Sequence, residues 1–246
     1  MMKKTLTLTL TLTLTSALLM GSFNLQAASL DDSQKQEVKD LVRKTLVENP
    51  DILIEAMNEL RKKEVAVQQQ SDQQILSARS QALFGNSDNP VIGNPNAKLT
   101  IAYFTDYNCQ YCKRQDPILR KITEENPNVK FVIKETPILG PASTEATQYS
   151  LATFNQQKDK YTTIGHRLMS KPGKHNSNSI KAAFKAEGID VKKLEINAAV
   201  AKQINDNLKL FQELGLRGTP AIVFPDEMLR GYTDESVLRE MIKERT

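Results

Sequence analysis

The sequence contains Leu99-Thr-Ile-Ala-Tyr-Phe-Thr-Asp-Tyr-Asn-Cys-Gln-Tyr-Cys112, in which an apolar segment leads into the only two cysteines of the chain. Residues 98–104 predict a strand, and residues 109–125 predict a helix that begins at the first cysteine. A Cys-x-x-Cys pair between a strand and a helix can attack a disulfide and then release itself. Thiol–disulfide exchange is therefore the first hypothesis for this protein.

The two cysteines are expected to differ in role. Cys109 would lie at the first turn of its helix, where unpaired backbone N–H groups stabilise an anion and lower the pKa of a thiol. It is therefore the expected attacking residue. Cys112, one turn further along, would be more buried and would resolve the mixed disulfide formed on Cys109. Gln110 and Tyr111 lie between them, where they are expected to contact substrate and tune the redox potential.

The N-terminus has the pattern of a secretory signal peptide. Lys3 and Lys4 precede an uncharged run, Thr5–Phe23, and small residues follow at Ala27 and Ala28. We predict that residues 1–27 are removed and that the protein is exported, to the periplasm. A transmembrane anchor is the alternative for this segment. A lipoprotein anchor is not expected, because no cysteine lies near the cleavage point.

Composition limits the remaining possibilities. Cleavage after Ala27 leaves 219 residues, enough for one domain and an appendage, and lowers the formal net charge from +4 to +2. That charge is too small and too evenly spread to predict a nucleic-acid partner. A single cysteine pair is also unlike the several bridges of a disulfide scaffold. A reactive role explains the cysteine pair better than a structural disulfide does.

Residues 28–84 are predicted to form a helical arm. Apolar residues at helical spacing predict one helix over 31–48, capped by Asp31, Asp32 or Ser33, and a second helix starts near Asp51. This apolar stripe must be buried, either against the main domain or against the same segment of other subunits. We favour an oligomerisation arm forming a dimer or trimer, because the polar stretch 61–82 reads as a spacer rather than as a docked helix.

The composition changes near residues 85–90, where we place the start of a catalytic domain over 85–246. Besides the strand and helix around the cysteines, we expect a short extended piece at 90–92 and a strand at 129–135. A helical insert spans about 143–214 and breaks at 171–174 and 188. A short hairpin at 221–224 and 229–232 and a final helix at 234–245 follow. This is an α/β layout with a helical insertion.

Metal binding is the competing use of a cysteine pair. A zinc site needs two more ligands, and the two histidines, His166 and His175, lie in loop-like sequence without the usual zinc spacing. We expect both histidines to be ordinary surface or packing residues. Two thiolates can hold a cuprous ion, so copper binding stays open as a secondary property. We expect no resident metal and no cofactor.

Two further motifs resemble the thioredoxin superfamily. Pro117 follows Cys112 by five residues, inside the predicted helix, where it should remove a backbone hydrogen bond and kink the helix. Far downstream, Gly218-Thr219-Pro220 resembles the cis-proline loop that faces the cysteines in that family. The resemblance implies that the Thr219–Pro220 bond is cis and that Thr219 offers its backbone to an extended substrate.

The likeness extends to the DsbA-type branch of the superfamily. It covers the segments around Phe104–Cys109 and Lys134–Gly140 and the helical insert, and the N-terminal arm resembles the Com1/ScsC-like subgroup of exported thiol–disulfide proteins. Asp106 and Glu135 match acidic positions near the cysteines in that branch. Either carboxylate is a candidate proton relay for Cys112, with an ordinary surface or capping role as the alternative.

The residues between the cysteines indicate whether the protein is expected to form disulfides or to reduce and rearrange them. Oxidising DsbA enzymes typically carry Pro-His there and Val before the cis-proline, whereas this chain has Gln110-Tyr111 and Thr219. The pattern is more similar to that of disulfide isomerases. We therefore expect an exported disulfide isomerase or reductase that acts on misfolded or disulfide-containing exported proteins and is reduced by a membrane thiol reductase of the DsbD type. A DsbA-like dithiol oxidase and a copper-binding or chaperone-like protein are the alternatives.

Overall fold

The structure is a computed structural model that describes residues 30–85 and 89–246. The predicted signal segment, 1–27, lies outside the described residues. Within the described ranges, no helix is both long enough and apolar enough to cross a membrane. The chain divides into two compact units, one ending at Glu59 and the other beginning at Leu60.

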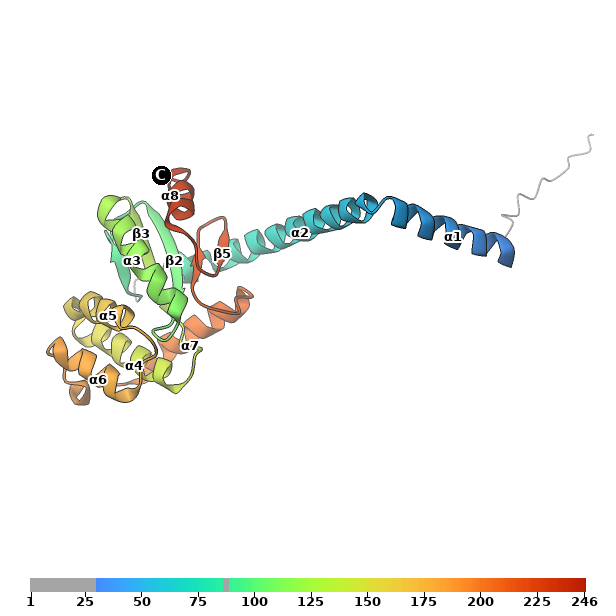
Figure 1. Cartoon of the computed structure of the whole chain (residues 1–246). Helices are drawn as coiled ribbons and strands as arrows, with labels where there is room; N and C mark the ends of the chain where they lie inside the picture. Colours follow the sequence, from blue (N-terminus) through green and yellow to red (C-terminus); the bar gives the residue numbers. More distant parts are fainter. Residues whose placement is uncertain (1–29, 86–88) are drawn as a thin grey trace, which may run out of the picture. The chain divides into compact units, whose positions relative to one another are not determined.

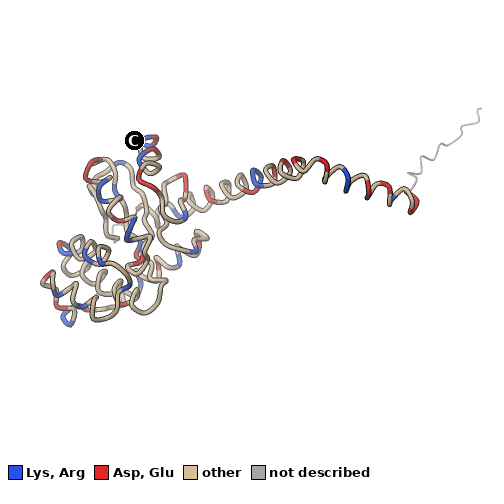
Figure 2. The backbone as a smooth tube through the Cα atoms, viewed as in Figure 1, with Lys and Arg blue, Asp and Glu red and all other residues tan. Residues whose placement is uncertain are grey.

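The first unit contains helix α1 (Asp32–Glu48) and the start of α2 (Asp51–Phe84). Asp31 caps α1, because its Oδ1 accepts a hydrogen bond from the Gln34 amide at 2.9 Å while the Gln34 side chain accepts one from the Asp31 amide. This confirms the predicted start of the helix. Basic and acidic side chains are interspersed along both helices (Figure 2).

Helix α2 continues unbroken to Phe84. Residues 61–71 are exposed along it, but the prediction of a polar spacer is wrong for the rest of the stretch 61–82, because the last turns of α2 are docked within the second unit. Leu76 and Leu83 are almost completely buried in one cluster with Phe104 and Phe211. The compact unit accordingly starts at Leu60, earlier than the composition change near 85–90 suggests. These two leucines lie one heptad apart, so they share the face of α2 that enters the core, while the other faces remain exposed.

Polar contacts fix the same part of α2. Asp72 and Arg230 form a two-pronged ion pair, with both N–O distances at 2.8 Å. The buried Lys134 donates from Nζ to the Ala82 carbonyl at 2.8 Å, in the last turn of α2, where a cation is favourable. Burial lowers the pKa of Lys134 to about 8.

A five-stranded mixed sheet forms the centre of the second unit. Its order is β1-β3-β2-β4-β5, with β2 and β3 parallel and the other neighbouring pairs antiparallel. The strands are β1 (Val91–Gly93), β2 (Leu99–Thr105), β3 (Val129–Glu135), β4 (Ala221–Val223) and β5 (Met228–Arg230). The two longest strands lie side by side in the middle, so the predicted strands at 98–104 and 129–135 are confirmed.

Side chains alternate between the two faces of the sheet and build two cores. Ile101 and Tyr103 of β2 pack with α3 (Gln110–Glu125) and α8 (Glu235–Lys243). Ala102 and Phe104 point to the opposite face, towards α7 (Ala198–Glu213) and the docked half of α2. Both faces are thereby covered by helices, as the alternation in β2 requires.

The helical insert has a core of its own. It contains α4 (Pro141–Gln156), α5 (Tyr161–Ser170), α6 (Ser177–Ala186) and α7, with short 3-10 turns at Lys158–Lys160 and Val191–Lys193. The first three helices gather beside one end of the sheet (Figure 1). This confirms the insert and its breaks at 171–174 and 188, while the breaks at 157–160 and 191–197 were not predicted.

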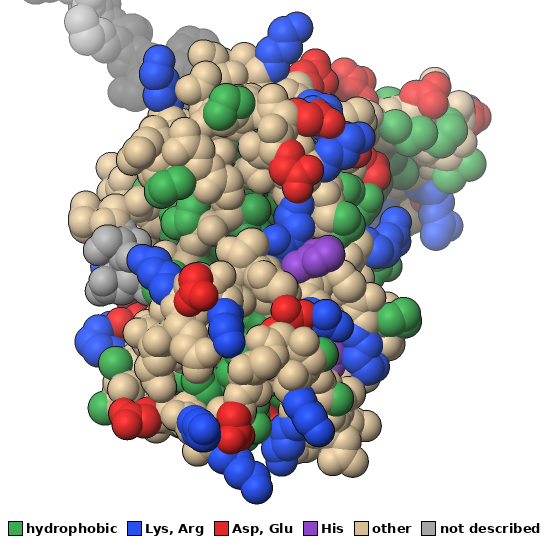
Figure 3. Space-filling view, turned by 90° about the vertical axis from the view of Figure 1, so that its left-hand side faces the viewer, with side chains coloured by type: hydrophobic (Ala, Val, Ile, Leu, Met, Phe, Trp, Pro, Cys, Tyr) green, Lys and Arg blue, Asp and Glu red, His purple; other side chains and the backbone are tan. Residues whose placement is uncertain are grey.

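Charged side chains of both signs and separate hydrophobic groups share the face drawn in Figure 3.

The sheet brings the two predicted motifs together. β2 ends at Thr105 and α3 begins at Gln110, so the cysteine pair lies at the end of a central strand. β4 starts immediately after Pro220 and pairs with β2, with Ala221 opposite Phe104. The turn before α3 and the loop before β4 therefore lie at the same end of the sheet.

Candidate dithiol site

Cys109 is the N-cap residue of α3. Its backbone is extended, at φ −80° and ψ 117°, and its Sγ accepts a hydrogen bond from the Cys112 amide at 3.3 Å. A sulfur therefore takes the place that Ser, Asp or Asn usually takes at a helix start, where orphan N–H groups favour negative charge. Cys109 is 6% exposed and Cys112 is fully buried, so of these two residues only Cys109 is open to an incoming molecule.

Thr219 lies directly against Cys109. The Cys109 thiol donates to the Thr219 carbonyl across 3.1 Å, which joins residues 110 positions apart in sequence. The Thr219–Pro220 peptide bond is cis. The structure thus confirms the cis bond expected from the resemblance and places this loop beside the cysteine pair.

The two thiols have opposite acidities. The hydrogen bond from the Cys112 thiol has the largest effect on the pKa of Cys109 and lowers it. The Thr219 side chain and the amides of residues 111 and 112 lower this pKa further. Together they outweigh burial and bring the pKa of Cys109 to about 6. Burial, followed by the hydrogen bond and charge of Cys109, raises the pKa of Cys112 far above its usual value. Cys109 is therefore a thiolate at neutral pH, and Cys112 keeps its proton.

The Thr219 side chain also faces the sulfurs. The hydroxyl oxygen of Thr219 is buried and has no hydrogen-bond partner that meets the usual distance and angle limits among the described residues. Near the sulfurs, this group lowers the pKa of both Cys109 and Cys112. A polar side chain at the position before Pro220 thus contributes electrostatically to the site.

Gln110 and Tyr111 form the outer wall of the site. Both are exposed, and the Tyr111 ring lies 6.4 Å from that of Tyr232, at a tilt of 41°. The Arg114 guanidinium lies over both rings, at 5.7 Å from Tyr111 and 4.6 Å from Tyr232. Arg114 and Tyr232 were not predicted as site residues, although Arg114 lies one helical turn beyond Tyr111.

Gln115 is a second residue that the sequence did not single out. It is fully buried, and its amide group exchanges two hydrogen bonds with the Thr233 backbone, at 2.9 and 3.1 Å. These bonds attach α3 to the chain that follows β5. Pro117 lies inside α3 as expected. The only sequence signal for Gln115 is its position one turn after the buried Cys112.

Asp106 has the contacts of a capping residue. Its Oδ1 accepts from the Asn108 amide at 2.7 Å, and its Oδ2 accepts from the amides of Ile138 and Leu139 at 2.9 and 3.0 Å. Both oxygens are therefore engaged by backbone donors. Of the two roles considered for Asp106, this geometry favours holding the active-site turn against the loop after β3.

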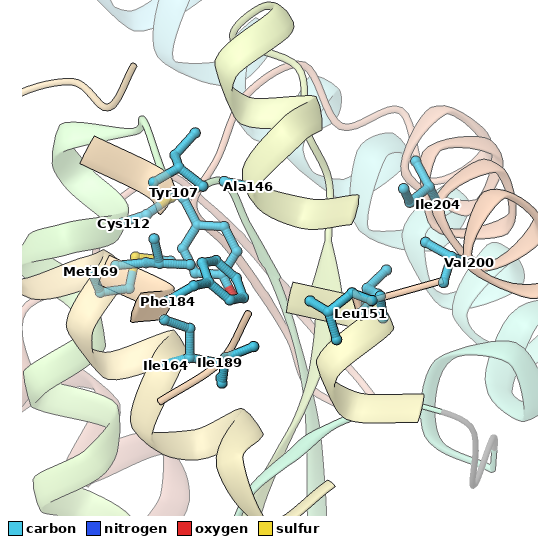
Figure 4. Close-up of a cluster of buried hydrophobic side chains, with 14 of the residues drawn as sticks. Tyr107, Cys112, Ala146, Leu151, Ile164, Met169, Phe184, Ile189, Val200 and Ile204 are labelled. Carbon is cyan, nitrogen blue, oxygen red and sulfur yellow. The ribbon is translucent and has the colours of Figure 1, made fainter. Parts of the chain in front are cut away.

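Glu135 lies in a buried hydroxyl cluster. Its Oε1 accepts hydrogen bonds from Tyr107, Ser150 and Tyr161, each at 2.8 Å, while Oε2 has no hydrogen-bond partner among the described residues. Burial raises the pKa of Glu135 to about 7 despite these donors. Tyr107 connects this cluster to the site, because it packs in the same hydrophobic cluster as Cys112 (Figure 4). No direct hydrogen bond joins Glu135 to either described cysteine.

Basic residues and one histidine attach the insert to the active-site turn. Lys113 donates to the carbonyls of Lys171 and Gly173 at 2.8 and 2.6 Å, and burial, followed by the charge of Lys171, lowers the pKa of Lys113 to about 8. The His175 amide donates to the Asn108 side chain at 2.5 Å, and its ring Nε2 lies 2.8 Å from the Leu168 carbonyl. His175 is thus a packing residue, as expected, and His166 is exposed.

The arrangement combines an accessible thiolate, a buried thiol behind it and a backbone loop beside them. It can form a mixed disulfide on Cys109 and resolve it through Cys112. Within residues 30–85 and 89–246, no cluster of three or more His, Cys, Asp or Glu side chains is arranged to hold a metal ion. A metal bound at this site would therefore rely on the two thiolates.

Comparison with known families gives two matches. Residues 100–243 match the DSBA-like thioredoxin domain, and residues 34–66 match the copper resistance protein ScsC N-terminal domain. Among curated proteins, the chain is 24% identical over 173 residues to disulfide bond formation protein D of Bacillus subtilis (strain 168). That alignment covers 63% of this chain and 75% of the relative.

Solved structures show the same likeness. A linker-deletion mutant of Proteus mirabilis ScsC superimposes with a TM-score of 0.68 and is 37% identical, covering 88% of this chain and 97% of the other. A periplasmic thioredoxin-like protein from Salmonella enterica serovar Typhimurium gives a TM-score of 0.64 at 34% identity, covering 67% and 94%. The likeness to ScsC extends into the helical arm, beyond the thioredoxin-like region alone.

Proposed function

Because this chain is a ScsC-like member of the DsbA-like thioredoxin family of thiol–disulfide oxidoreductases, we propose that it is a protein disulfide isomerase and reductase. Cys109 is the attacking residue and Cys112 the resolving residue. The observation that carries the exchange chemistry is the Cys109 sulfur at the start of α3, in contact with the cis Thr219–Pro220 loop and in front of the buried Cys112. The choice of isomerase and reductase rests on Gln110-Tyr111 between the cysteines and Thr219 before the cis-proline.

The reaction starts at Cys109. Its thiolate attacks one sulfur of a substrate disulfide, a bond forms between Cys109 and that sulfur, and the substrate S–S bond breaks. The second substrate sulfur leaves as a thiolate and takes a proton. In isomerisation this sulfur attacks another disulfide of the substrate as its thiolate and releases a different substrate thiolate. That thiolate finally attacks the substrate sulfur bonded to Cys109 and displaces Cys109 as a thiolate, with no net change in electrons.

Reduction uses Cys112 instead. Cys112 loses its proton and attacks the Cys109 sulfur, the substrate leaves as a thiol, and a Cys109–Cys112 disulfide forms. Two electrons have then passed to the substrate and must be replaced by an external thiol donor, for which we propose a membrane reductase of the DsbD type. Burial is the largest cause of the raised pKa of Cys112 and persists when Cys109 is bonded to substrate. It therefore disfavours the Cys112 thiolate, which prolongs the mixed disulfide and gives the substrate time to rearrange.

The arm is proposed to assemble the subunits. Val38, Leu41 and Val42 of α1 are 47%, 63% and 50% exposed, and Leu53 and Met57 of α2 are 49% and 53% exposed. Isolated helices seldom keep such stripes in water, because burying them against another helix is favourable. A second or third copy of the same arm supplies a matching surface. Joined catalytic domains would surround a misfolded substrate with several Cys109 thiolates.

We further propose export to the periplasm, directed by residues 1–27. Substrate disulfides form and persist in oxidising compartments such as the periplasm. The Salmonella relative described as periplasmic supports this location.

Truncation tests the role of the arm. Deleting residues 28–59 removes α1 and the first part of α2 but keeps Leu76 and Leu83 in the core. We expect this variant to be a monomer that reduces an insulin disulfide at the full-length rate per Cys109 but reactivates scrambled ribonuclease poorly. Unchanged reactivation by the monomer would contradict the proposal. Deletion of 28–84 is unsuitable, because it would remove both buried leucines.

A dithiol oxidase is the second candidate, and one observation favours it. A thiolate stabilised as strongly as that of Cys109 favours the reduced pair and so makes its disulfide more oxidising. The relative from Bacillus subtilis is named for disulfide bond formation. Oxidative refolding of reduced ribonuclease by the disulfide form of this protein, measured against its isomerase rate, separates the two functions.

Copper binding is a third candidate, supported by the name of the matched N-terminal domain and by the two sulfurs of the site. Metal analysis of the reduced protein loaded with cuprous ion tests it. Copper retained by the wild type and lost from Cys109→Ser would support a role for the pair in copper handling.

A further inference from the structure

One cation at the outer wall of the dithiol site contacts only aromatic rings among the described residues. Arg114 is exposed near the start of α3, and its guanidinium lies 4.6 Å from the centre of the Tyr232 ring and 5.7 Å from that of Tyr111. The face of a ring attracts the charge of a guanidinium, but it does not replace the oxygen acceptors that the five N–H groups can bind. Within the described part of the chain, Arg114 has no carboxylate partner.

The other basic residues of α3 are all bound to oxygen atoms. Lys113 donates to two carbonyls of the loop after α5, at 2.8 and 2.6 Å. Arg120 pairs with a carboxylate of its own helix at 2.7 Å, and Lys121 pairs with one on α8 at 3.0 Å. Arg114 is therefore the cation of α3 whose N–H groups remain available to a molecule outside the chain.

The structure holds this guanidinium beside the segment that joins the two cysteines. Tyr111 belongs to that segment. Tyr232 is fixed from the other side, because its neighbour Thr233 exchanges two hydrogen bonds with Gln115, the residue after Arg114. The two rings and these two bonds restrict the arginine before a ligand arrives, which lowers the entropic cost of binding one.

The chemistry of the guanidinium indicates the ligand. Its planar fork of N–H groups matches a carboxylate, which it binds through two parallel hydrogen bonds. The partners of thiol–disulfide exchange are polypeptides, whose carboxylates are the side chains of Asp and Glu. Cys109 is a thiolate at neutral pH and repels such groups. A cation at the wall of the site offsets this repulsion.

We propose that Arg114 binds the carboxylate of an Asp or Glu close in sequence to the substrate cysteine, so that the site favours polypeptides with an acidic residue beside the disulfide. Tyr111 and Tyr232 act as positioning residues for its guanidinium. The inference rests on the proposed thiol–disulfide exchange and adds to it a preference for substrate charge, which the two sulfurs alone do not provide.

A series of peptides with different charges tests the proposal. Reduced full-length protein is mixed with short peptides whose cysteine is activated as a pyridyl disulfide. The Cys109 thiolate forms a bond to the peptide sulfur, the S–S bond breaks, and the aromatic sulfur leaves with the electron pair as neutral thiopyridone after taking a proton. Its release gives a second-order rate constant. The peptides carry Asp, Asn or Lys at a position shortly before or shortly after the cysteine.

We expect the wild type to react about fivefold faster with the Asp peptide than with the Asn peptide at one of these positions, near the upper end of what an exposed ion pair contributes. Arg114→Gln removes the charge and should bring this ratio to about one. Lys185→Gln is the matched control, because it removes an equal charge from an exposed position on α6, and it should keep the wild-type ratio.

Tyr232→Leu tests the positioning role of the rings. It keeps the charge of Arg114 and removes the nearer ring, so the Asp-to-Asn ratio should fall to about twofold, because a more mobile arginine loses more entropy on binding. A wild-type ratio in Tyr232→Leu would overturn the role given to the rings.

The other outcomes separate this inference from the proposed function. Equal wild-type rates with the Asp and Asn peptides at both positions would overturn the role of Arg114 and leave the exchange chemistry intact. A ratio lowered as much by Lys185→Gln as by Arg114→Gln would assign the preference to net charge and would also overturn it. Absence of thiopyridone release by the wild type would overturn the proposed function itself.

Discussion

The Cys109 sulfur and the Thr219 carbonyl oxygen lie 3.1 Å apart, so the turn before α3 and the cis-proline loop form one site. This contact places a backbone acceptor beside the sulfur, and the Cys112 amide is a backbone donor to the same sulfur at 3.3 Å. The protonated sulfur can donate to this carbonyl, and the thiolate keeps the hydrogen bond from the Cys112 amide. The electrostatics and packing around it can be tested residue by residue.

The reactivity of Cys109 should follow a low pKa. Because the thiolate is the reacting species and the pKa of Cys109 is about 6, the rate of alkylation by iodoacetamide should rise with pH through about 6 and level off above neutrality. Cys112, with its raised pKa and full burial, should not react over the same range. Mass-resolved alkylation between about pH 4 and pH 9 measures both sites. A midpoint near that of a free thiol would contradict this description.

Thr219→Val should raise the pKa of Cys109. The substitution removes the hydroxyl group that lowers the pKa of both sulfurs and keeps the shape of the side chain. Because that hydroxyl has no hydrogen-bond partner among the described residues, its loss should cost little stability. Thr233→Val is the control, since the hydrogen bonds between Thr233 and Gln115 of α3 are made by the Thr233 backbone, which the substitution keeps. An alkylation midpoint that moves equally in both variants would count against a specific role for Thr219.

Leu83→Ala should destabilise the second unit by about 2–5 kcal/mol, because it leaves a cavity where a fully buried side chain packs in the core. Gln74→Ala, on an exposed face of the same helix, should change stability by less than about 0.5 kcal/mol. All six tyrosines lie between residues 103 and 232, so near-ultraviolet circular dichroism in urea reports this unit alone. Equal midpoints for the two variants would mean that α2 is not docked in solution.

Glu135→Gln should alter how stability depends on pH. The carboxyl has its pKa raised from 4.5 to about 7, so the folded state binds its proton more tightly than the unfolded state does. Stability should consequently fall as pH rises from about 4.5 to about 7, by at most about 3 kcal/mol. Glutamine does not titrate, so the variant should gain stability relative to wild type at about pH 8 and show no gain at about pH 4.

The difference between the Glu135→Gln and wild-type urea midpoints isolates this effect, because both proteins share the opposite trend from Cys109. That thiol, with its pKa lowered from 9.0 to about 6, contributes stability above the unfolded pKa that is lost as pH falls towards 6. A constant difference between the two proteins from about pH 4 to pH 8 would contradict the raised pKa of Glu135.

Much of the fold could be predicted because its signals are local. The strand over 129–135 is an apolar run that follows a turn at Asn126-Pro127-Asn128, and its bounds agree with those of β3. The helix at the cysteines and the cis bond at Thr219 were predicted from two short motifs and are both present. The family follows from the same motifs, since they are separated by about 100 residues yet specify one site.

The rest could not be predicted because it depends on contacts between distant residues. Leu76 and Leu83, with Ile75 and Phe84 beside them, form a short apolar stripe in an otherwise polar segment, and the sequence does not show which surface this stripe packs against. A lysine within a strand usually faces solvent, yet Lys134 is buried and its ammonium group donates to the Ala82 carbonyl in the last turn of α2. The burial of Gln115 could not be predicted either, because its hydrogen-bond partner, the Thr233 backbone, is 118 positions away in sequence.

The central claim is that Cys109 and Cys112 act as a reduced pair that corrects disulfides. The most direct test is their redox state in the periplasm of a Gram-negative cell that contains a DsbD-type reductase, measured by acid quenching and alkylation with a thiol-specific mass tag. We predict that both cysteines take the tag in such cells and that neither does when the reductase is deleted. A pair that is oxidised in cells with the reductase would contradict the claim and would assign the protein to disulfide formation.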